Sequence, residues 1–365
     1  MKILYDHQIF SIQIFGGISR YFNELSVILE SKKDIQTEFS VKISNNFYLS
    51  QKSISFYSFF KKASFKGKIR FIYFVNKIYS IYVLKKKNFD VFHPTYYDPY
   101  FLKYLGNKKF VLTVYDMIHE KFPDKFAEFD KTSKNKKILV NKASKIIAIS
   151  ESTKKDLIDI YDVNPSKIEV VYLANSLQLN SETYIKIKLP KKYILFVGAR
   201  DGYKNFMNFL SSVTEILKSD TNLHLVCAGG GKFNDQENLF IYQNNLENQL
   251  LQFNIDDKTL SYLYSNAKAF VFPSLYEGFG IPVLEAFACG CPLICSNTSS
   301  LSEIASDAAV YFDPLDEKSI ETAVLGILKG QELRATMIEK GYKRLKFFSW
   351  KKTAQLSEKV YQSII

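Results

Sequence analysis

Two glutamates in the stretch SLYEGFGIPVLEA, residues 274–286, are the first candidates for chemistry in this sequence. Glu277 and Glu285 lie eight positions apart, and two glycines and Pro282 stand between them. Proline suits the first turn of a helix and glycine the position after its end, so a helix is expected at about 282–289. Taken alone, the stretch is equally typical of a tight turn that leads into a helix, so the rest of the chain must decide.

The expected start of that helix would bind an anion. Its first N–H groups, from about Gly280 to Val283, have no partner within the helix and lie at the positive end of its dipole. A phosphate can approach such a backbone closely when the residues are small. Glu285 is expected in the first turn, where it could accept hydrogen bonds from two vicinal hydroxyls of a ribose. Glu277 precedes the turn and would point into a cleft.

A second candidate is the loop VGARDGYKNF, residues 197–206, which ends a short apolar run. Arg200 and Lys204 lie four positions apart in this loop. Two cations beyond the carboxyl end of a strand would suit a diphosphate, with arginine in a forked contact and lysine as a point charge. A solvated loop is the alternative interpretation of such a pair.

The size and charge of the chain indicate two unlike domains. A chain of 365 residues is too long for one ordinary core. Residues 1–190 contain 31 lysines and arginines against 18 acids, a net charge of +13, whereas residues 191–365 contain 18 against 19 and carry −1. This asymmetry predicts that one domain faces an anionic partner.

The sequence suggests no spanning helix and no signal peptide, so a cytoplasmic protein with reduced cysteines is expected. No run of eighteen uncharged apolar residues suggests a spanning helix, and the N-terminal MKILYDHQIF is typical of a first strand rather than of a signal peptide. The four cysteines lie in apolar surroundings, and no second cluster supplies zinc ligands. Buried free thiols are therefore expected.

Short β-rich runs alternate with amphipathic segments in both halves, which predicts parallel α/β units. Strands are expected at 2–6, 89–94, 109–116, 145–150, 168–173, 192–198, 223–229, 269–274, 292–296 and 309–312. Helices are expected at 18–31, 71–86, 131–143, 152–161, 205–218, 259–266, 282–288, 317–328 and 331–346, with a last helix after Ser349. In such folds the functional residues follow the carboxyl ends of the strands.

The pattern predicts two successive Rossmann-like domains. The first, basic domain is expected to cover residues 1–177 and the second residues 192–346, with a polar linker at 178–191. Residues 347–365 are expected to form a C-terminal helix that crosses back to the first domain.

The order of several motifs resembles that of retaining GT-B glycosyltransferases of family 4, also called group 1, and in particular O-antigen and polysaccharide mannosyltransferases. The resemblance covers nearly the whole chain, and although each motif alone is weak, their common order is specific. The motifs are FGGISRYFNEL (15–25), FDVFHPTYY (89–97), LTVYDMIHEKFP (112–123), IIAISESTKKDL (146–157), VGARDGYKN (197–205), PSLYEGFGIPVLEAFACGCPLI (273–294) and FSW (348–350).

The resemblance implies the GT-B fold, in which two Rossmann-like α/β domains face each other across a cleft. The residues that it implies for catalysis are Glu277, Arg200, Lys204, Asp116 and His119. Those that it implies for donor binding are Gly16, Gly17, Arg200, Lys204, Asn254, Ile255, Glu277, Gly278, Phe279, Gly280, Ile281 and Glu285.

Some of these positions carry a more specific implied role. The Gly16–Gly17 loop would lie under the donor phosphate and near the acceptor, and the Asn254–Ile255 loop would touch the base through its main chain. The family often has a histidine before Asp116, where this chain has Tyr115, and His119 follows three positions later. Which of these three side chains meets the sugar stays open here.

The expected function is transfer of a hexose from a nucleotide-sugar to a growing surface polysaccharide, with retention of configuration and without a metal or other cofactor. GDP-mannose is the first donor expected, with UDP- or dTDP-sugars as alternatives, and the acceptor is expected to be a glycan linked to a lipid. The enzyme would be cytoplasmic and peripheral at the inner face of the plasma membrane.

Three other classes of protein share some of these features. A nucleotide-sugar-binding or peripheral membrane protein of the same fold that has lost catalysis is the main alternative. A nucleic-acid-binding protein has only the charge in its favour, because no nucleic-acid motif is present. A dinucleotide oxidoreductase would need Gly-x-Gly-x-x-Gly after the first strand, which neither FGGISR nor GGGKFN fits.

Residues 52–70, KSISFYSFFKKASFKGKIR, mix aromatic and basic side chains, and residues 39–89 contain no aspartate or glutamate. Residues 71–84 suit a helix packed on the sheet, but the apolar side chains of 52–70 have no such explanation. We therefore expect 52–70 to form an amphipathic flap that docks on an anionic membrane surface.

Overall fold

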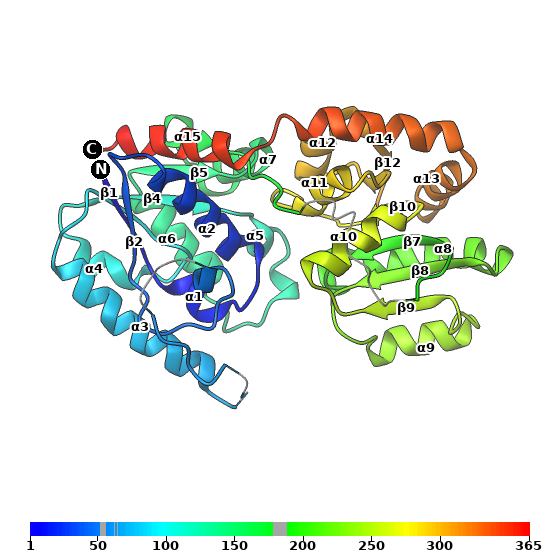
Figure 1. Cartoon of the computed structure of the whole chain (residues 1–365), viewed down its shortest axis with the longest axis horizontal. Helices are drawn as coiled ribbons and strands as arrows, with labels where there is room; N and C mark the ends of the chain where they lie inside the picture. The colour runs from blue at the N-terminus through cyan, green and yellow to red at the C-terminus, as the bar shows by residue number, and fades with distance from the viewer. Residues whose placement is uncertain (52–55, 62, 64, 178–187) are drawn as a thin grey trace. The chain divides into compact units, whose positions relative to one another are not determined.

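The chain folds into two compact units, one formed by Met1–Leu173 with Ser349–Ile365 and the other by Ala174–Phe348 (Figure 1). The structure, a computed structural model, describes residues 1–51, 56–61, 63, 65–177 and 188–365. Most of the expected linker 178–191 and part of the segment 52–70 therefore lie outside the described residues.

The first unit is built on a six-stranded parallel sheet of order β2-β1-β3-β4-β5-β6. Its strands are β1 (Lys2–Tyr5), β2 (Gln36–Phe39), β3 (Val91–His93), β4 (Lys109–Val114), β5 (Lys145–Ala148) and β6 (Ile168–Val170). Its helices are α1 (Gln8–Ile12), α2 (Gly17–Glu30), α3 (Lys68–Lys85), α4 (Leu102–Leu105), α5 (Ile118–Lys121), α6 (Thr132–Lys142), α7 (Glu151–Tyr161) and α15 (Trp350–Gln362).

The second unit has its own parallel sheet of order β12-β11-β10-β7-β8-β9. Its strands are β7 (Lys192–Val197), β8 (Leu223–Ala228), β9 (Leu250–Phe253), β10 (Ala269–Phe272), β11 (Leu293–Ser296) and β12 (Ala309–Phe312). Its helices are α8 (Phe206–Ser219), α9 (Asp235–Gln243), α10 (Asp257–Asn266), α11 (Ile281–Ala288), α12 (Ser299–Ala305), α13 (Glu317–Lys329) and α14 (Gln331–Leu345).

The apolar runs of the sequence form the central strands, because a parallel sheet covered by helices buries both faces of each strand. In β7 the residues from Tyr193 to Val197 are all buried, and α8 and α13 pack on the same core. The expected α/β architecture of two parallel-sheet units is confirmed. All four cysteines are buried and form no disulfide, as expected of free thiols.

Two strands, β2 and β9, were not expected from the sequence. Each forms the outer edge of its sheet and is four residues long. An edge strand packs against a neighbour on one side alone, so it needs no continuous apolar run, and the partly exposed QTEF of β2 illustrates this. Their short, mixed sequences explain why a pattern search passes over them.

The C-terminal helix α15, drawn in red in Figure 1, is part of the first unit although it ends the chain. Its N-cap Ser349 accepts a hydrogen bond from the backbone N–H of Lys352 at 3.2 Å. The hydroxyl of Tyr361 lies 2.8 Å from Nδ1 of His93, whose Nε2 lies 2.9 Å from Oγ1 of Thr113. The first unit is therefore completed by residues from the far end of the sequence.

Two buried histidines make the stability of the first unit depend on pH. Burial lowers the pKa of His7 and of His93 to about 3, so both are neutral when folded. As pH falls below about 6.5, the two histidines become protonated in the unfolded state but stay neutral in the folded state. Each histidine therefore lowers the free energy of unfolding by about 1.4 kcal/mol per pH unit. Burial raises the pKa of the Asp6 carboxyl, and its proton uptake in the folded state offsets part of this loss.

We therefore expect the free energy of unfolding to fall as pH is lowered from 6 to 4. In His93→Asn, the slope of this free energy against pH should be smaller by up to about 1.4 kcal/mol per pH unit. The fluorescence of Trp350, the single tryptophan, reports urea unfolding of the first unit. His224→Asn, at a partly exposed site in the second unit, is the matched control. An unchanged slope in His93→Asn would contradict the assignment.

Among the helices that the structure describes, none is both long and apolar enough to cross a bilayer.

Candidate active site

The sheet order of the second unit indicates a candidate ligand site between β7 and β10. After β7 the chain adds β8 and β9 on one side, and it then returns to add β10, β11 and β12 on the other. Ligands of such sheets bind where the order reverses, beyond the carboxyl ends of the two strands. The loops that leave β7 and β10 carry Lys204 and Glu277, which therefore lie at the reversal point.

Lys204 and Glu277 form an ion pair at this point, with Nζ of Lys204 2.6 Å from Oε1 of Glu277. The hydroxyl of Ser274 also donates to Oε1 at 2.7 Å, and the backbone N–H of Glu277 donates to Oγ of Ser299 at 2.9 Å. The two charged side chains are 18% and 12% exposed, so both keep an opening to solvent. The Lys204 ammonium and the Glu277 carboxylate are thus fixed in place and still accessible to a ligand.

The helix α11 begins beside this pair, as the sequence predicts. Gly280 is its N-cap with φ at +94°, a left-handed conformation that favours glycine. A Cβ at this position would lie 2.9 Å from Cδ2 of Leu301. Pro282 occupies the first turn, and no side chain among the described residues caps the helix start. The backbone N–H groups at this end therefore depend on a ligand, on solvent or on the main chain.

Glu285 lies just past the first turn of α11, one position later in the helix than expected, because the helix begins at Ile281. Its carboxyl is buried, and Oε2 accepts a hydrogen bond from the hydroxyl of Tyr264 at 3.2 Å. Burial, together with the nearby Glu285 carboxylate, raises the pKa of Tyr264 well above its usual range. The expectation that Glu285 sits in the first turn is wrong, because the helix starts one residue earlier than the proline suggests.

The side chain of Arg200 is buried in the second unit, where it forms hydrogen bonds with neighbouring residues. Its Nε donates to Oε1 of Glu237 at 2.9 Å, and its terminal nitrogens donate to the carbonyls of Gly229, Gly231 and Lys232 at 2.7 to 3.2 Å. The Arg200 side chain is 4% exposed. These contacts favour a role in holding the loop after β8 over a direct contact with a diphosphate.

Glu237 was missed by the sequence analysis, although a signal for it exists. Asn234 and Glu237 form a capping box at the start of α9, in which each side chain bonds the backbone N–H of the other. The spacing Asn-x-x-Glu before a helix is the sequence signature of such a box. Glu237 therefore connects Arg200 to the helix start and to the loop between β8 and α9.

The loops after β8 and β9 come together at the same edge of the sheet. Gly229, Gly230 and Gly231 all have positive φ, and a Cβ on Gly230 would lie 2.6 Å from the carbonyl oxygen of Gly198. The N–H of Gly229 donates to the carbonyl of Phe253, the last residue of β9. Asn254 and Ile255 follow directly, so this structure places them beside the glycine loop.

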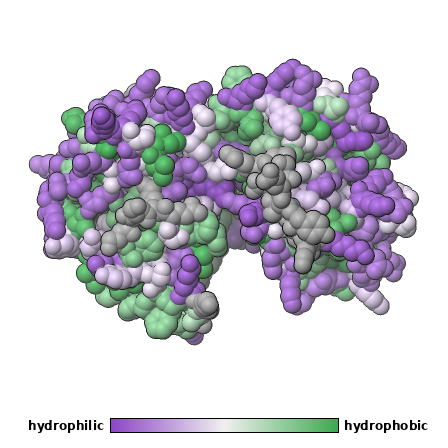
Figure 2. Space-filling model, in the orientation of Figure 1, coloured by the Kyte–Doolittle hydropathy of each residue, from purple (hydrophilic) through white to green (hydrophobic). Residues whose placement is uncertain are grey.

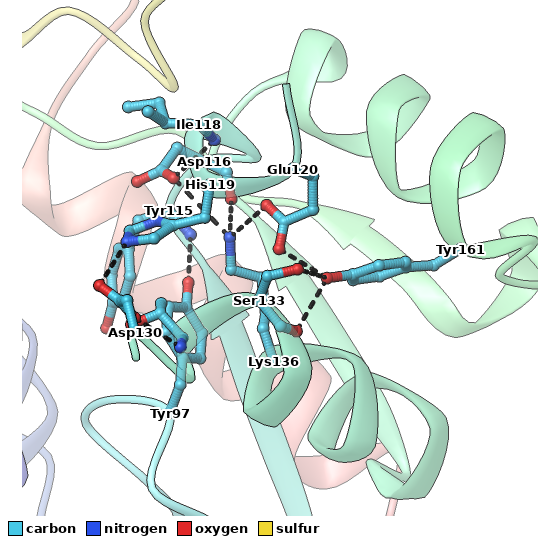
Figure 3. Close-up of polar contacts among 11 residues, drawn as sticks. Tyr97, Tyr115, Asp116, Ile118, His119, Glu120, Asp130, Ser133, Lys136 and Tyr161 are labelled. Carbon is cyan, nitrogen blue, oxygen red and sulfur yellow. Dashed lines mark hydrogen bonds and ion pairs between the residues drawn. The ribbon is translucent and has the colours of Figure 1, made fainter. Parts of the chain in front are cut away.

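In the first unit, Tyr115, Asp116 and His119 follow strand β4 (Figure 3). Tyr115 is buried and its hydroxyl donates to the carbonyl of Thr95 at 3.3 Å, so it faces the interior. The side chain of Asp116 is 27% exposed, and its carboxylate accepts a hydrogen bond from the N–H of Ile118 at 3.0 Å. Of the three candidates, Tyr115 is buried, whereas Asp116 is partly open to solvent.

His119 is held on two sides and has one nitrogen without a partner. Its ring stacks on Phe126 with 3.8 Å between centroids, and Nε2 lies 3.5 Å from Oδ2 of Asp130. Nδ1 is buried and has no hydrogen-bond partner among the residues that the structure describes. An unsatisfied buried nitrogen is costly, which favours a ligand group or a water at this position.

A buried lysine supports this loop and was not expected from the sequence. Lys136 of α6 is fully buried, and its Nζ donates to the carbonyl of Asp116 at 2.9 Å and to Oε2 of Glu120 at 2.8 Å. The hydroxyl of Tyr161 bonds Oε1 of Glu120 at 2.6 Å (Figure 3). Burial alone would raise the pKa of Glu120, but the Lys136 ammonium and these hydrogen bonds lower it. Lys136 thus fixes the backbone that presents Asp116.

The Gly16–Gly17 pair forms the start of α2, as the sequence predicts. Gly16 is the N-cap in an extended conformation, and its carbonyl accepts hydrogen bonds from the Ser19 hydroxyl and the Arg20 N–H. A Cβ at Gly16 would meet the end of the Gln13 side chain at 2.4 Å. The residues expected for catalysis and donor binding thus fall into two sets, with Gly16, Gly17, Asp116 and His119 in the first unit and the others in the second.

Two family models match the sequence, one for each unit. The model described as "Glycosyltransferase Family 4" matches residues 15–174, and the model described as "Glycosyl transferases group 1" matches residues 181–344. Together they cover most of the chain.

Curated relatives include mannosyltransferases of bacterial surface polysaccharides. The O-antigen chain mannosyltransferase B of Escherichia coli is 28% identical over 224 residues, which are 58% of this chain and 58% of that protein. The O-antigen chain mannosyltransferase RfbU of Salmonella typhimurium is 30% identical over 246 residues, 61% of this chain and 65% of that protein. The matched parts thus span less than two thirds of these relatives.

Solved structures show the same fold over the whole chain. A sucrose-phosphate synthase from Thermosynechococcus elongatus has a TM-score of 0.76 at 18% identity and covers 99% of this chain and 98% of its own. The Anabaena protein HepE in complex with UDP and glucose has a TM-score of 0.74 at 14% identity and covers both chains fully, at 100%. These likenesses concern the fold.

Proposed function

The chain belongs to the group 1 glycosyltransferases of family 4, with the GT-B fold, and we propose that it transfers a hexose from a nucleotide-sugar to a growing surface polysaccharide. The observation that carries this proposal is the Lys204–Glu277 pair at the point where the sheet order of the second unit reverses. Mannose is the sugar we propose first, because the curated relatives include O-antigen mannosyltransferases. GDP-mannose would then be the donor, with UDP- and dTDP-sugars as alternatives.

The second unit would bind the donor and stabilise the leaving group. As the bond between the sugar and the diphosphate breaks, negative charge grows on the diphosphate. Lys204 and the positive end of α11 would stabilise that charge, and no metal ion is needed for this role in the proposal. Glu277 would contact the transferred sugar, and Glu285 the ribose. Arg200 would act indirectly, by holding the glycine loop after β8.

The first unit would bind the acceptor. Its loop from Asp116 to His119 presents a carboxylate and an imidazole, and Lys136 holds that loop in place. We propose a glycan linked to a lipid as the acceptor and retention of the anomeric configuration in the product. A lipid-linked acceptor would make the enzyme a peripheral protein at the inner face of the plasma membrane.

The activity is tested by incubating the protein with a panel of nucleotide-sugars and candidate acceptors and measuring release of nucleoside diphosphate. Release that depends on both substrates is expected, with GDP-mannose the best donor. Proton NMR of the product then reports the configuration at the new bond. An inverted product would contradict the retaining mechanism, and donor binding without any release would favour a binding protein that has lost catalysis.

Glu285→Ala is expected to weaken binding of the nucleoside diphosphate by roughly tenfold to a hundredfold, because a hydrogen bond to a charged group contributes about 1.5–3 kcal/mol. Isothermal titration measures the affinity. Tyr264→Phe is the matched control, since it removes the hydroxyl that Glu285 binds and leaves the carboxylate in place. Equal affinity of wild type and Glu285→Ala, with the fold intact, would refute the ribose contact.

A further inference from the structure

Helix α3 has two apolar faces, and the protein covers one of them. Its buried face packs inward through Ile72, Val83 and Leu84, with Asn76 and Ser80 hydrogen-bonded beneath them. The opposite face carries a second apolar stripe at spacings of three, four and four residues. The stripe consists of Phe71, Phe74, Ile78 and Tyr82, which are 47%, 62%, 55% and 55% exposed.

This exposed stripe differs from what the sequence predicts. Residues 71–84 were expected to be a helix packed on the sheet, with the unexplained apolar residues confined to 52–70. Because the side chains of the stripe repeat with the helical period, a periodicity search assigns them to a core face. The fold shows that the core takes the other side of α3.

The described part of the preceding loop extends the stripe. Phe59 stacks on Phe71 with 4.9 Å between ring centroids, and Phe60 and Phe65 lie 6.0 Å apart. Nζ of Lys68 donates to the carbonyls of Phe60 and Ala63, each at 2.7 Å, so the loop is tied to the start of α3. The side chains that remain exposed in this loop include Tyr57, Phe60 and Phe65.

These exposed side chains together form a surface that we call the α3 patch. It consists of Tyr57, Phe60, Phe65, Phe71, Phe74, Ile78 and Tyr82. Figure 2 shows a hydrophobic area on the surface of the first unit, in the region where Figure 1 draws α3 and its preceding loop. A soluble protein seldom exposes so many large apolar side chains together unless the surface binds something.

The segment that carries the α3 patch contributes only basic charged side chains, although Asp98 from outside it pairs with Lys77 of α3 at 3.0 Å. Residues 39–89 contain no aspartate or glutamate, and Lys61, Lys66, Arg70 and Lys85 are exposed beside the patch. A surface pocket of about 640 Å³ opens at its edge, lined by Ile14, Phe65, Lys66 and Arg70 among others. The occupant must therefore be apolar in part and anionic in part.

The geometry points to an anionic phospholipid membrane as that occupant, and we propose that the α3 patch docks the enzyme on it. Aromatic side chains favour the boundary between headgroups and acyl chains, and cations beside them are attracted to anionic lipid. A second copy of this chain fits poorly, because a symmetric dimer through this patch would bring its cations against each other. This inference deepens the proposed function by naming the surface that would bring the enzyme to a lipid-linked acceptor.

Co-sedimentation with vesicles tests this docking without any sugar donor, so its outcome is independent of catalysis. Wild type is expected to bind vesicles of phosphatidylcholine with phosphatidylglycerol, to bind pure phosphatidylcholine weakly, and to release at high salt. Changing Lys61, Lys66 and Arg70 to serine together should reduce binding on the order of a hundredfold, at about fivefold for each cation.

The apolar part of the patch is tested by Phe74→Gln combined with Ile78→Gln, which keeps good helix formers on α3. Binding should fall by at least about tenfold. The matched control is Leu239→Gln combined with Tyr242→Gln, an exposed apolar pair at the same kind of helical position on α9. Circular dichroism confirms that each variant is folded.

Three outcomes would overturn the proposal. Wild type that stays in the supernatant with anionic vesicles would do so, as would α3 variants that bind as well as the α9 control. The third concerns self-association, measured by light scattering. If wild type is a dimer, and the Phe74→Gln, Ile78→Gln variant is a monomer that still binds vesicles as wild type does, the patch is a dimer interface.

Discussion

Lys204→Ala is expected to lower the turnover number by roughly a hundredfold or more, while the protein stays folded. The ammonium of Lys204 stands at the point where the sheet order reverses, 2.6 Å from Glu277, and is the described cation best placed to meet a diphosphate there. Because charge on the diphosphate grows as the sugar departs, a cation held in place contributes more to the transition state than to donor binding. The loss should therefore appear in kcat more than in KM.

The matched control is Lys192→Ala at the other end of the same strand. Lys192 begins β7 and pairs with Asp220, with 2.5 Å between Nζ and Oδ2. Since exposed ion pairs contribute little, this variant should keep wild-type turnover and almost all of the stability. Rates within about threefold of each other for the two alanine variants would show that Lys204 does not act on the leaving group.

Arg200→Met is expected to lower the free energy of unfolding of the second unit by about 3–5 kcal/mol, because it leaves the buried carboxylate of Glu237 without its cation. It also removes the donors that hold the carbonyls of Gly229, Gly231 and Lys232. Urea unfolding followed by circular dichroism measures the loss. Trp350 fluorescence reports the first unit and should change little.

Two comparisons separate this positioning role from a direct contact with the diphosphate. Arg200→Met combined with Glu237→Gln should recover part of the stability, since the second change removes the unpaired charge. A variant Arg200→Met that is as stable as wild type and yet loses turnover about a hundredfold would instead show that Arg200 touches the donor, as the sequence suggests.

Much of the architecture could be predicted from the sequence, because it depends on local periodicity. The apolar runs that became β7 and β10 are buried on both faces, so their composition alone identifies them. Gly280 and Pro282 mark the start of α11 within one residue, since a left-handed N-cap and a first-turn proline each require a particular residue type. The edge strands β2 and β9 carry no such constraint and were missed.

The sequence by itself determined that this chain has two parallel α/β units and which loops carry charged groups beyond the strand ends. Only the tertiary structure decided which partner each group meets. Arg200 and Lys204 are equivalent candidates in the sequence. In the structure Arg200 is buried against Glu237, whereas Lys204 pairs with Glu277 and stays partly exposed to solvent. Likewise, the two stripes of α3 look equally suited to a core, and packing left one of them exposed. The physical reason is that periodicity reports what a segment can bury, whereas strand order, set by contacts far apart in the chain, determines what lies beside it.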